Sequence, residues 1–249
     1  MSETTKIYSY QDLPEDLKKE ALDIIREDVH DDYNWDEETD YIAGALEEDY
    51  GLNDVKIEFT GFYSQGDGAS FTGRVRDMGL FLSKVAPDVF KILEKTESLE
   101  KFNEVTSISF KRTGHNYVHS GSCETEMEND DYEELAHEHI FSVDSSKIVS
   151  KASNYHYNIL FFLPFGSKLV HYIGDDIFKS PLAINLEKLY EKIEAWRKRE
   201  CDKIYRSLEK TDEDMGSDEN IEEVITGNDY KFEVELDEDG EPIELMGLA

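Results

Sequence analysis

The chain has 249 residues, of which 39% are hydrophobic and 12% are aromatic, and its formal net charge is −32 at pH 7. This length and apolar content allow one large domain or two small ones, and they exclude a wholly disordered chain. The surplus of carboxylates argues against direct binding to nucleic acid or to an anionic membrane, because phosphate contacts require cations.

The predicted elements begin with two amphipathic helices. Pro14 and the acidic residues after it mark the start of the first helix, which fades near residues 30–32. Apolar residues recur at helical spacing within it. A second helix is predicted from about Asp36 to Tyr50, where Gly51 is a favourable stop.

A hairpin with a glycine-rich loop is predicted next. Alternating apolar and polar residues indicate strands at 55–59 and 71–75. Between them, Ser64, Gln65 and Asp67 stand among glycines, which is strong turn chemistry. The simpler interpretation is a structural turn. The alternative is a functional loop whose polar side chains project from a rigid hairpin, although the loop lacks the lysine of a phosphate-binding loop.

The remainder of the chain predicts further helices and strands. A helix at 77–95 has a break near Pro87, and it is followed by strands at 104–111 and 115–128 joined at Thr113-Gly114 and by strands at 140–144 and 155–163. A long helix at 181–210 carries Arg197-Lys198-Arg199 on its outer face, and an acidic connector occupies 211–220. A short helix, which Ser217 or Asp218 caps and which ends at Gly227, leads to a terminal hairpin.

This order predicts an α+β fold with N-terminal helices, a central antiparallel sheet with hairpins, a long C-terminal helix and a terminal hairpin. We expect a main domain at 1–210. Residues 211–249 would form an acidic connector, a short helix and a hairpin packed on that domain.

The central histidines raise the possibility of a metal site. On strands, His115, His119 and Cys123 would share a face, as would His137 and His139. A site for zinc or another divalent metal could combine His115, His119, His137 and His139 with Asp67 as a further ligand. The spacing matches no standard zinc motif, so the default interpretation is surface or strand-packing histidines and no cofactor. No nucleophile motif is present, no catalytic residue is identified, and a non-enzymatic protein is favoured.

Acidic runs without lysine or arginine occupy residues 27–40 and 124–138. They predict either a solvated, self-repelling surface or a negative face that binds a cationic partner. The candidate binding residues of such a face are the acids Asp31, Asp32, Glu37 and Glu38 and the aromatic anchor Trp35.

Several motifs resemble a family of uncharacterised small proteins encoded by bacteriophages and prophages. The residues that carry the resemblance are Tyr8-Ser9-Tyr10, the run from Thr60 to Ala69, Arg112-Thr113-Gly114-His115, Tyr117-Val118-His119, Ile221-Glu222-Glu223 and the run from Asn228 to Phe232. The resemblance covers about half of the chain, and residues 144–181 look like additional material. It implies a phage origin and no particular activity.

The sequence therefore favours a cytoplasmic, phage-encoded accessory protein that binds a basic surface of a host protein, as an anti-defence or host-takeover inhibitor or as a nucleic-acid mimic. Two cysteines and an N-terminus without signal-peptide features fit an intracellular setting. The alternatives are a metal-dependent enzyme or metal-stabilised module, and a structural or assembly protein. The oligomeric state is left open.

Overall fold

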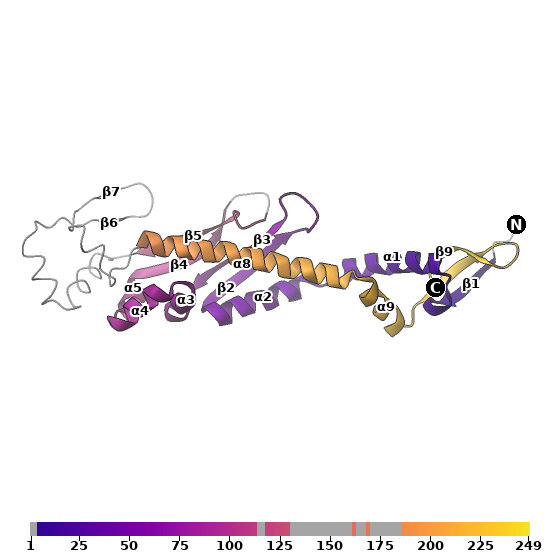
Figure 1. The fold of residues 1–249 in the computed structure, drawn as a ribbon, viewed down its shortest axis with the longest axis horizontal. Coiled ribbons are helices and arrows are strands. Elements are labelled where there is room, and N and C mark those ends of the chain that lie inside the picture. Colours follow the sequence, from indigo (N-terminus) through magenta and orange to yellow (C-terminus); the bar gives the residue numbers. More distant parts are fainter. Residues whose placement is uncertain (1–3, 114–117, 130–160, 163–167, 170–185) are drawn as a thin grey trace, which may run out of the picture. The chain divides into compact units, whose positions relative to one another are not determined.

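A computed structural model of the chain describes residues 4–113, 118–129, 161–162, 168–169 and 186–249 (Figure 1). The described residues form helices and antiparallel sheets, which confirms the predicted α+β class. The chain divides into two compact units: unit 1 combines Met1–Trp35 with Arg206–Ala249, and unit 2 is Asp36–Tyr205. The predicted boundary at residue 210 lies within a helix, and the residues after it group with the N-terminal segment.

Unit 1 contains a three-stranded antiparallel sheet with helices packed on one face. Its elements are β1 (Thr4–Ser9), the 3₁₀ helix η1 (Tyr10–Asp12), α1 (Glu15–Asp32), the end of α8 (Leu186–Met215), α9 (Asp218–Gly227), β8 (Lys231–Leu236) and β9 (Pro242–Leu248). The strand order is β1-β8-β9. Apolar residues of α1 and α9 pack against Phe232, Val234 and Leu245 of the sheet. The predicted cap at Ser217 and the terminal hairpin are confirmed.

The predicted acidic connector at 211–220 is wrong in its first half, because α8 continues to Met215. Leu208, Asp212 and Met215 recur at helical spacing and are all buried. The carboxylate of Asp212 lies 3.3 Å from Nε2 of His30 on α1. In the described part of the chain no helix, α8 included, pairs sufficient length with sufficient apolar content for a transmembrane span.

Unit 2 is built around a four-stranded antiparallel sheet with the order β2-β3-β4-β5. Its elements are α2 (Trp35–Tyr50), β2 (Leu52–Thr60), β3 (Gly68–Val75), α3 (Met78–Val85), α4 (Pro87–Lys95), α5 (Leu99–Val105), β4 (Thr106–Arg112), β5 (Cys123–Asn129), the two-residue strands β6 (Phe161–Phe162) and β7 (Lys168–Leu169), and the first part of α8. The predicted hairpin and the helix break at Pro87 are confirmed. The predicted strand at 140–144 and most of that at 155–163 lie outside the described residues.

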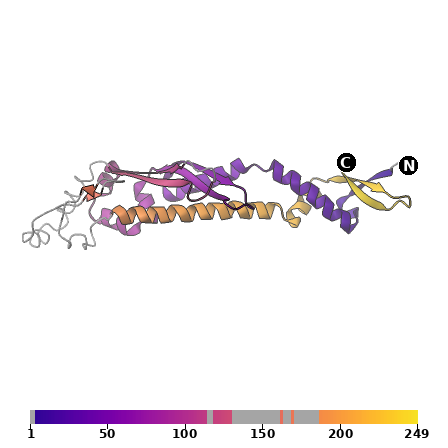
Figure 2. The same cartoon turned by 90° about the horizontal axis from the view of Figure 1, so that it is seen from above.

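The core of unit 2 is centred on Trp196 of α8. Its indole ring lies 5.8 Å from the ring of Phe71 on β3 and 5.5 Å from that of Phe110 on β4. It also contacts Phe81 of α3 at 5.2 Å and Tyr50 of α2 at 4.8 Å. These contacts bring α2, α3 and α8 to the same face of the sheet, and Figure 2 shows α8 running alongside the strands.

The connection between β4 and β5 is longer than the predicted turn at Thr113-Gly114. The register pairs Arg112 with Cys123, so residues 113–122 lie between the two strands. Residues 118–122 form a turn with its own hydrogen bonds rather than the start of a strand. This turn contains His119 and packs against the glycine-rich loop at Gly68.

Candidate functional site

The glycine-rich loop between β2 and β3 is closed by its own aspartate. The Asp67 carboxylate accepts a hydrogen bond from the Ser64 N–H at 2.6 Å, and the Asp67 N–H donates to the Ser64 carbonyl at 3.2 Å. Gly66 has a φ of 103°, which residues with a Cβ rarely adopt. Ser64 and Gln65 are exposed. Three predicted binding residues therefore share one loop, in which Asp67 holds the shape and Gln65 is accessible.

Replacing Asp67 with alanine is expected to lower the free energy of unfolding by about 1–2 kcal/mol, because the loop loses a charge-assisted hydrogen bond to its backbone. Urea denaturation measures this change. The matched variant Gln65→Ala removes an exposed side chain from the same loop and should stay within about 0.5 kcal/mol of the wild type. Equal stability of the two variants would contradict a structural role for Asp67.

A second connection packs against this loop at Gly68. A Cβ at Gly68 would lie 2.9 Å from Cα of His119 and 3.0 Å from the carbonyl oxygen of Val118, so the close approach requires glycine. At the other end of the loop, the Thr60 hydroxyl donates to the same Val118 carbonyl at 3.3 Å. Gly68 and Thr60 are therefore explained by a contact between two connections, the β2–β3 loop and the turn before β5, at one end of the sheet.

The turn before β5 is organised by His119. Its Nδ1 accepts a hydrogen bond from the Gly121 N–H at 2.9 Å, which requires a neutral ring to carry its proton on Nε2. The Ser122 hydroxyl donates to the His119 carbonyl at 2.7 Å and accepts from the His119 N–H at 3.0 Å. The predicted strand face containing His115, His119 and Cys123 is wrong at His119, because this residue lies in a turn.

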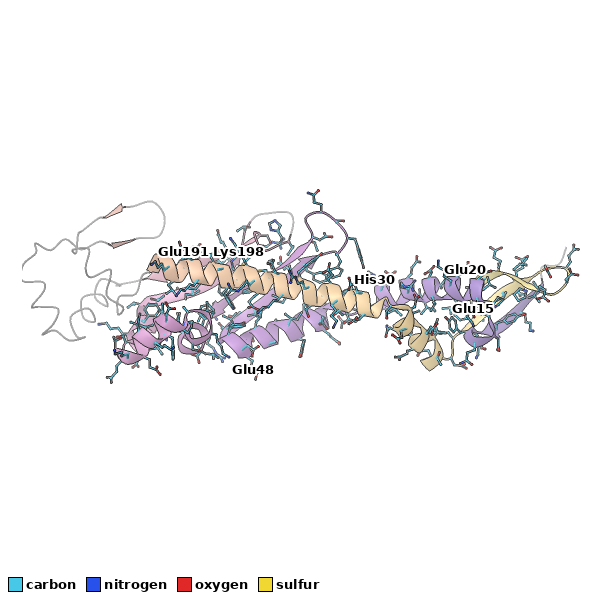
Figure 3. The ribbon with its side chains drawn as sticks, viewed as in Figure 1. Glu15, Glu20, His30, Glu48, Glu191 and Lys198 are labelled. Carbon is cyan, nitrogen blue, oxygen red and sulfur yellow. The ribbon has the colours of Figure 1, made fainter. Side chains whose placement is uncertain are left out.

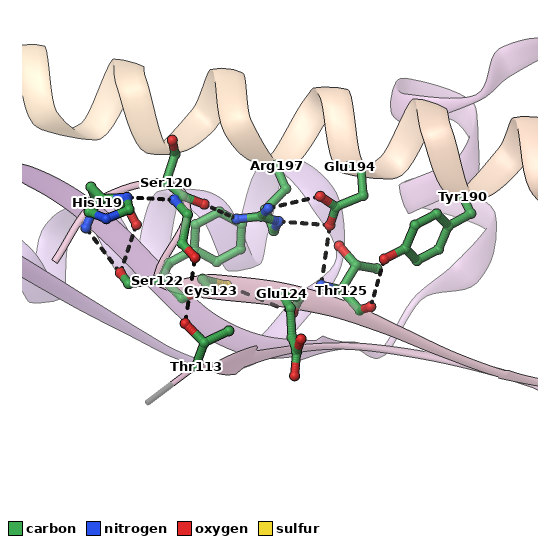
Figure 4. A network of polar contacts seen from close by, with 12 residues as sticks. Thr113, His119, Ser120, Ser122, Cys123, Glu124, Thr125, Tyr190, Glu194 and Arg197 are labelled. Carbon is green, nitrogen blue, oxygen red and sulfur yellow. Dashed lines mark hydrogen bonds and ion pairs between the residues drawn. The ribbon is translucent and has the colours of Figure 1, made fainter. Parts of the chain in front are cut away.

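Arg197 of α8 ties this turn to the helix. Its side chain is 2% exposed and is the largest of the fully buried side chains in the described residues. The guanidinium donates to both carboxylate oxygens of Glu194, at 3.0 and 2.9 Å, and to the carbonyl of Ser120 at 2.5 Å (Figure 4). Glu194 also accepts from the Thr125 N–H on β5 at 3.2 Å. The network joins α8, β5 and the turn that precedes β5.

The predicted position of Arg197 on the outer face of the long helix is wrong. Arg197 lies four residues after Ile193 and four before Cys201, and all three side chains are buried. This place on the apolar stripe is the signal that could have identified it from the sequence. The next residue, Lys198, is exposed as predicted.

The network also sets the charges of its members. Burial alone would raise the pKa of Glu194, but hydrogen bonds from Arg197 and Thr125 bring that pKa below its ordinary value. Burial alone would lower the pKa of Arg197, and its contacts with Glu194 raise it overall. Burial raises the pKa of the Cys123 thiol to about 11 and that of Cys201 to about 12. The thiols are therefore protonated at neutral pH and are poor nucleophiles. The role that fits the ion pair is structural.

The described residues contain no group of three or more His, Cys, Asp or Glu side chains that could hold a metal. Of the four histidines proposed as ligands, His119 lies in the turn, whereas His115, His137 and His139 fall outside the described ranges. Asp67, the proposed carboxylate ligand, closes its own loop. A zinc or other divalent-metal site stays a prediction.

The predicted acidic binding residues are divided between the two units. Asp31 and Asp32 end α1 in unit 1, where the side chain of Asp31 is 89% exposed. Trp35 is half-buried and makes an edge-on contact with a neighbouring tyrosine ring at 4.8 Å. Glu37, which is exposed, and Glu38, which is half-buried, lie in the first turn of α2. Each group is therefore a candidate surface of its own unit.

One exposed side of α2 combines carboxylates with an aromatic ring. We define the α2 face as Glu37, Asp40, Tyr41, Gly44 and Glu48, which recur at helical spacing and are all exposed. Tyr41 is 75% exposed, and Glu48 points away from the sheet and α8 (Figure 3). The 16 residues of α2 include seven acids and neither lysine nor arginine. The face therefore presents carboxylates around one large ring, with no lysine or arginine from α2 itself.

The acids in the last turn of α2 are unfavourable for the helix itself. Glu47 has a structural role, because its carboxylate accepts a hydrogen bond from the Val55 N–H at 3.0 Å. Glu48 and Asp49 are exposed beside the negative end of the helix dipole, where carboxylates destabilise a helix. The stability of the helix therefore does not explain Glu48 and Asp49.

A family match covers most of the chain. Neither the curated proteins nor the solved structures compared with it contain a match. Residues 34–218, about three quarters of the chain, match the family described as Domain of unknown function (DUF8835). The matched range includes the whole of unit 2, with its glycine-rich loop, α2 face and buried arginine network, and it extends past the end of α8. The chain therefore belongs to the DUF8835 family.

Proposed function

We propose that this protein is a phage-encoded accessory protein whose α2 face binds a basic surface of a host protein. The observation that carries the proposal is the exposed ring of Tyr41, which stands among exposed carboxylates on a helix without a cation. Protein interfaces commonly combine an aromatic anchor with a charged rim. The resemblance of the glycine-rich stretch to phage and prophage proteins supports the origin.

The chemistry of the α2 face selects a class of partner. Like charges on neighbouring helix turns repel one another in the free protein, and a cationic partner relieves that repulsion. Nucleic acid is disfavoured because its phosphates carry the same sign of charge. A surface rich in lysine and arginine, such as the nucleic-acid-binding surface of a host enzyme, fits best. Covering that surface would inhibit the host enzyme, which is how an anti-defence or host-takeover protein would act.

Neutralising the α2 face is expected to weaken partner binding about tenfold or more. The variant combines Glu37→Gln, Asp40→Asn and Glu48→Gln. Each exposed ion pair with the partner contributes about 0.2–1 kcal/mol to the binding free energy. A loss of about 1.4 kcal/mol weakens binding tenfold. Binding is measured by capture of host proteins on the immobilised wild type and variants between about 0.1 and 1 M NaCl, where screening increases. Wild-type capture should fall with salt, and the variant should lose most of that dependence.

A charge-matched control variant separates the α2 face from net charge. Glu94→Gln, Glu100→Gln and Glu104→Gln remove three exposed carboxylates from α4 and α5 of the same unit. This control should bind as the wild type does, and Tyr41→Ala alone should weaken binding with little change in salt dependence. Equal losses from the two triple variants would reduce the effect to overall charge, and full binding by the α2 variant would overturn the proposal.

A further inference from the structure

The sheet of unit 1 has two unlike edges. β8 is its central strand, and β1 and β9 each pair on one side only within the described residues. The register between β8 and β9 shifts twice, and β9 begins with Pro242. Bulges and prolines are devices that prevent an edge strand from pairing further. β1 has neither, since its six residues pair with β8 in one unbroken register.

The chemistry of β1 is unusual for this chain. Its residues are Thr4, Thr5, Lys6, Ile7, Tyr8 and Ser9, so the strand carries one cation and no carboxylate in a protein with a net charge of −32. Threonine, isoleucine and tyrosine are strand-forming residues. Ile7 is 62% exposed. The edge is therefore regular, apolar at its centre and free of carboxylates.

Alternation along β1 assigns its side chains to the two faces of the sheet. Tyr8 is opposite the buried Phe232 and packs against the core, so it lies on the face that the helices cover. Lys6 is on the same face, with its Nζ 4.9 Å from the centre of the Tyr8 ring. Ile7 is opposite Glu233 and lies on the uncovered face.

We propose that β1 pairs antiparallel with β1 of a second copy of this chain, in a register centred on Ile7. This register is self-complementary, as a two-fold interface requires. It places Ile7 opposite Ile7 of the second copy on the uncovered face, where the two exposed side chains cover each other. It also places Lys6 opposite Tyr8 of the second copy, which allows a cation–π contact in both directions.

A second copy fits this edge better than an unrelated strand. An acidic strand would find one ammonium group and no further cation on β1, whereas a basic strand would meet Lys6 as a like charge. A second β1 brings no carboxylate to the edge, and its Tyr8 ring can make a cation–π contact with the Lys6 ammonium group. The remaining obstacle is long-range repulsion between two molecules of charge −32, which salt screens. Dimerisation should therefore strengthen with salt, the opposite of the partner binding proposed for the α2 face.

Sedimentation equilibrium and light scattering test this proposal on the full chain. The weight-average mass should rise from 28.8 kDa towards twice that value with protein concentration, and it should rise more at about 1 M NaCl than at about 0.1 M. Ile7→Asp places two carboxylates opposite each other and should restore the monomer. Ile243→Asp is the matched control, because Ile243 is 53% exposed on the other edge strand and should leave the dimer intact.

Cross-linking tests the register and does not depend on how Ile7→Asp folds. Ile7→Cys should form an intermolecular disulfide under mild oxidation, because directly opposite positions are close enough to be bridged. The wild type should not cross-link, since Cys123 and Cys201 are buried. Ile243→Cys should cross-link no faster than random collision allows. A mass that stays at 28.8 kDa at every concentration and salt, or equal cross-linking of the two cysteine variants, would overturn the proposal.

Discussion

Arg197→Met should lower the free energy of unfolding by about 3–5 kcal/mol, the usual cost of breaking a buried ion pair by removing one partner. Methionine keeps much of the side-chain volume but leaves the Glu194 carboxylate without its bidentate donor and the Ser120 carbonyl without its N–H donor. Urea denaturation followed by Trp196 fluorescence, in a Trp35→Phe background, measures the change in the core that contains the network.

Two further variants identify the ion pair as the cause. Lys198→Met changes the next residue, which is exposed, and should stay within about 0.5 kcal/mol of the wild type. Arg197→Met combined with Glu194→Leu should recover part of the loss, because no carboxylate is then left without its cation. If the single and double variants are equally unstable, the loss comes from packing around Arg197 and not from an unpaired charge.

The same pair predicts a dependence on pH. Because the folded-state pKa of Glu194 is lower than its ordinary value, the stabilisation is fully present above that ordinary value. It is lost as the pH falls through the folded-state pKa. The stability difference between the wild type and the variant Glu194→Gln should therefore shrink on acidification, and it should be constant around neutral pH.

Trp196→Ala should cost about 3–5 kcal/mol, as is usual when a large aromatic side chain is removed from a core. Trp196 is 3% exposed and contacts aromatic rings from two strands and two helices. Removing the indole ring would therefore leave a cavity where α8 packs against the sheet and its neighbouring helices. Thermal unfolding followed by far-UV circular dichroism measures the loss without relying on tryptophan emission.

Tyr41→Ala is the control for this variant. It also removes an aromatic ring from unit 2, but that ring is 75% exposed, and the change should stay within about 0.5 kcal/mol. A loss for Trp196→Ala below about 1 kcal/mol would mean that the aromatic cluster is not the core of the unit. The pair of variants also separates the residue that stabilises the fold from the residue proposed to bind a partner.

Local signals in the sequence predicted many of the elements. Gly51, with a φ of 66°, ends α2, Pro87 opens α4 and Ser217 caps α9, so each boundary follows from one residue with a defined conformational preference. What escaped prediction depends on distant partners. β1 exists as a strand because it pairs with β8, more than 220 positions further along the chain. No local pattern contains that information.

The candidate site shows the same division. The sequence identified the loop that contains Asp67, but not that its carboxylate turns back onto Ser64. It assigned His119 to a strand because of alternation, whereas hydrogen bonds within residues 118–122 produce a turn. The predicted outer-face position of Arg197, within a basic cluster, missed its partner Glu194, which lies three residues before it on the same helix.

The division of the chain has a consequence for its synthesis. Unit 2 is one continuous segment inserted between the two segments of unit 1, so a ribosome releases all of unit 2 before it makes the second half of unit 1. Until β8 appears, the apolar stripe of α1, with Leu17, Ala21 and Ile25, has no sheet to cover it. The nascent protein therefore carries an incomplete module through most of translation, a state in which chaperone binding or a premature stop would have its largest effect on yield.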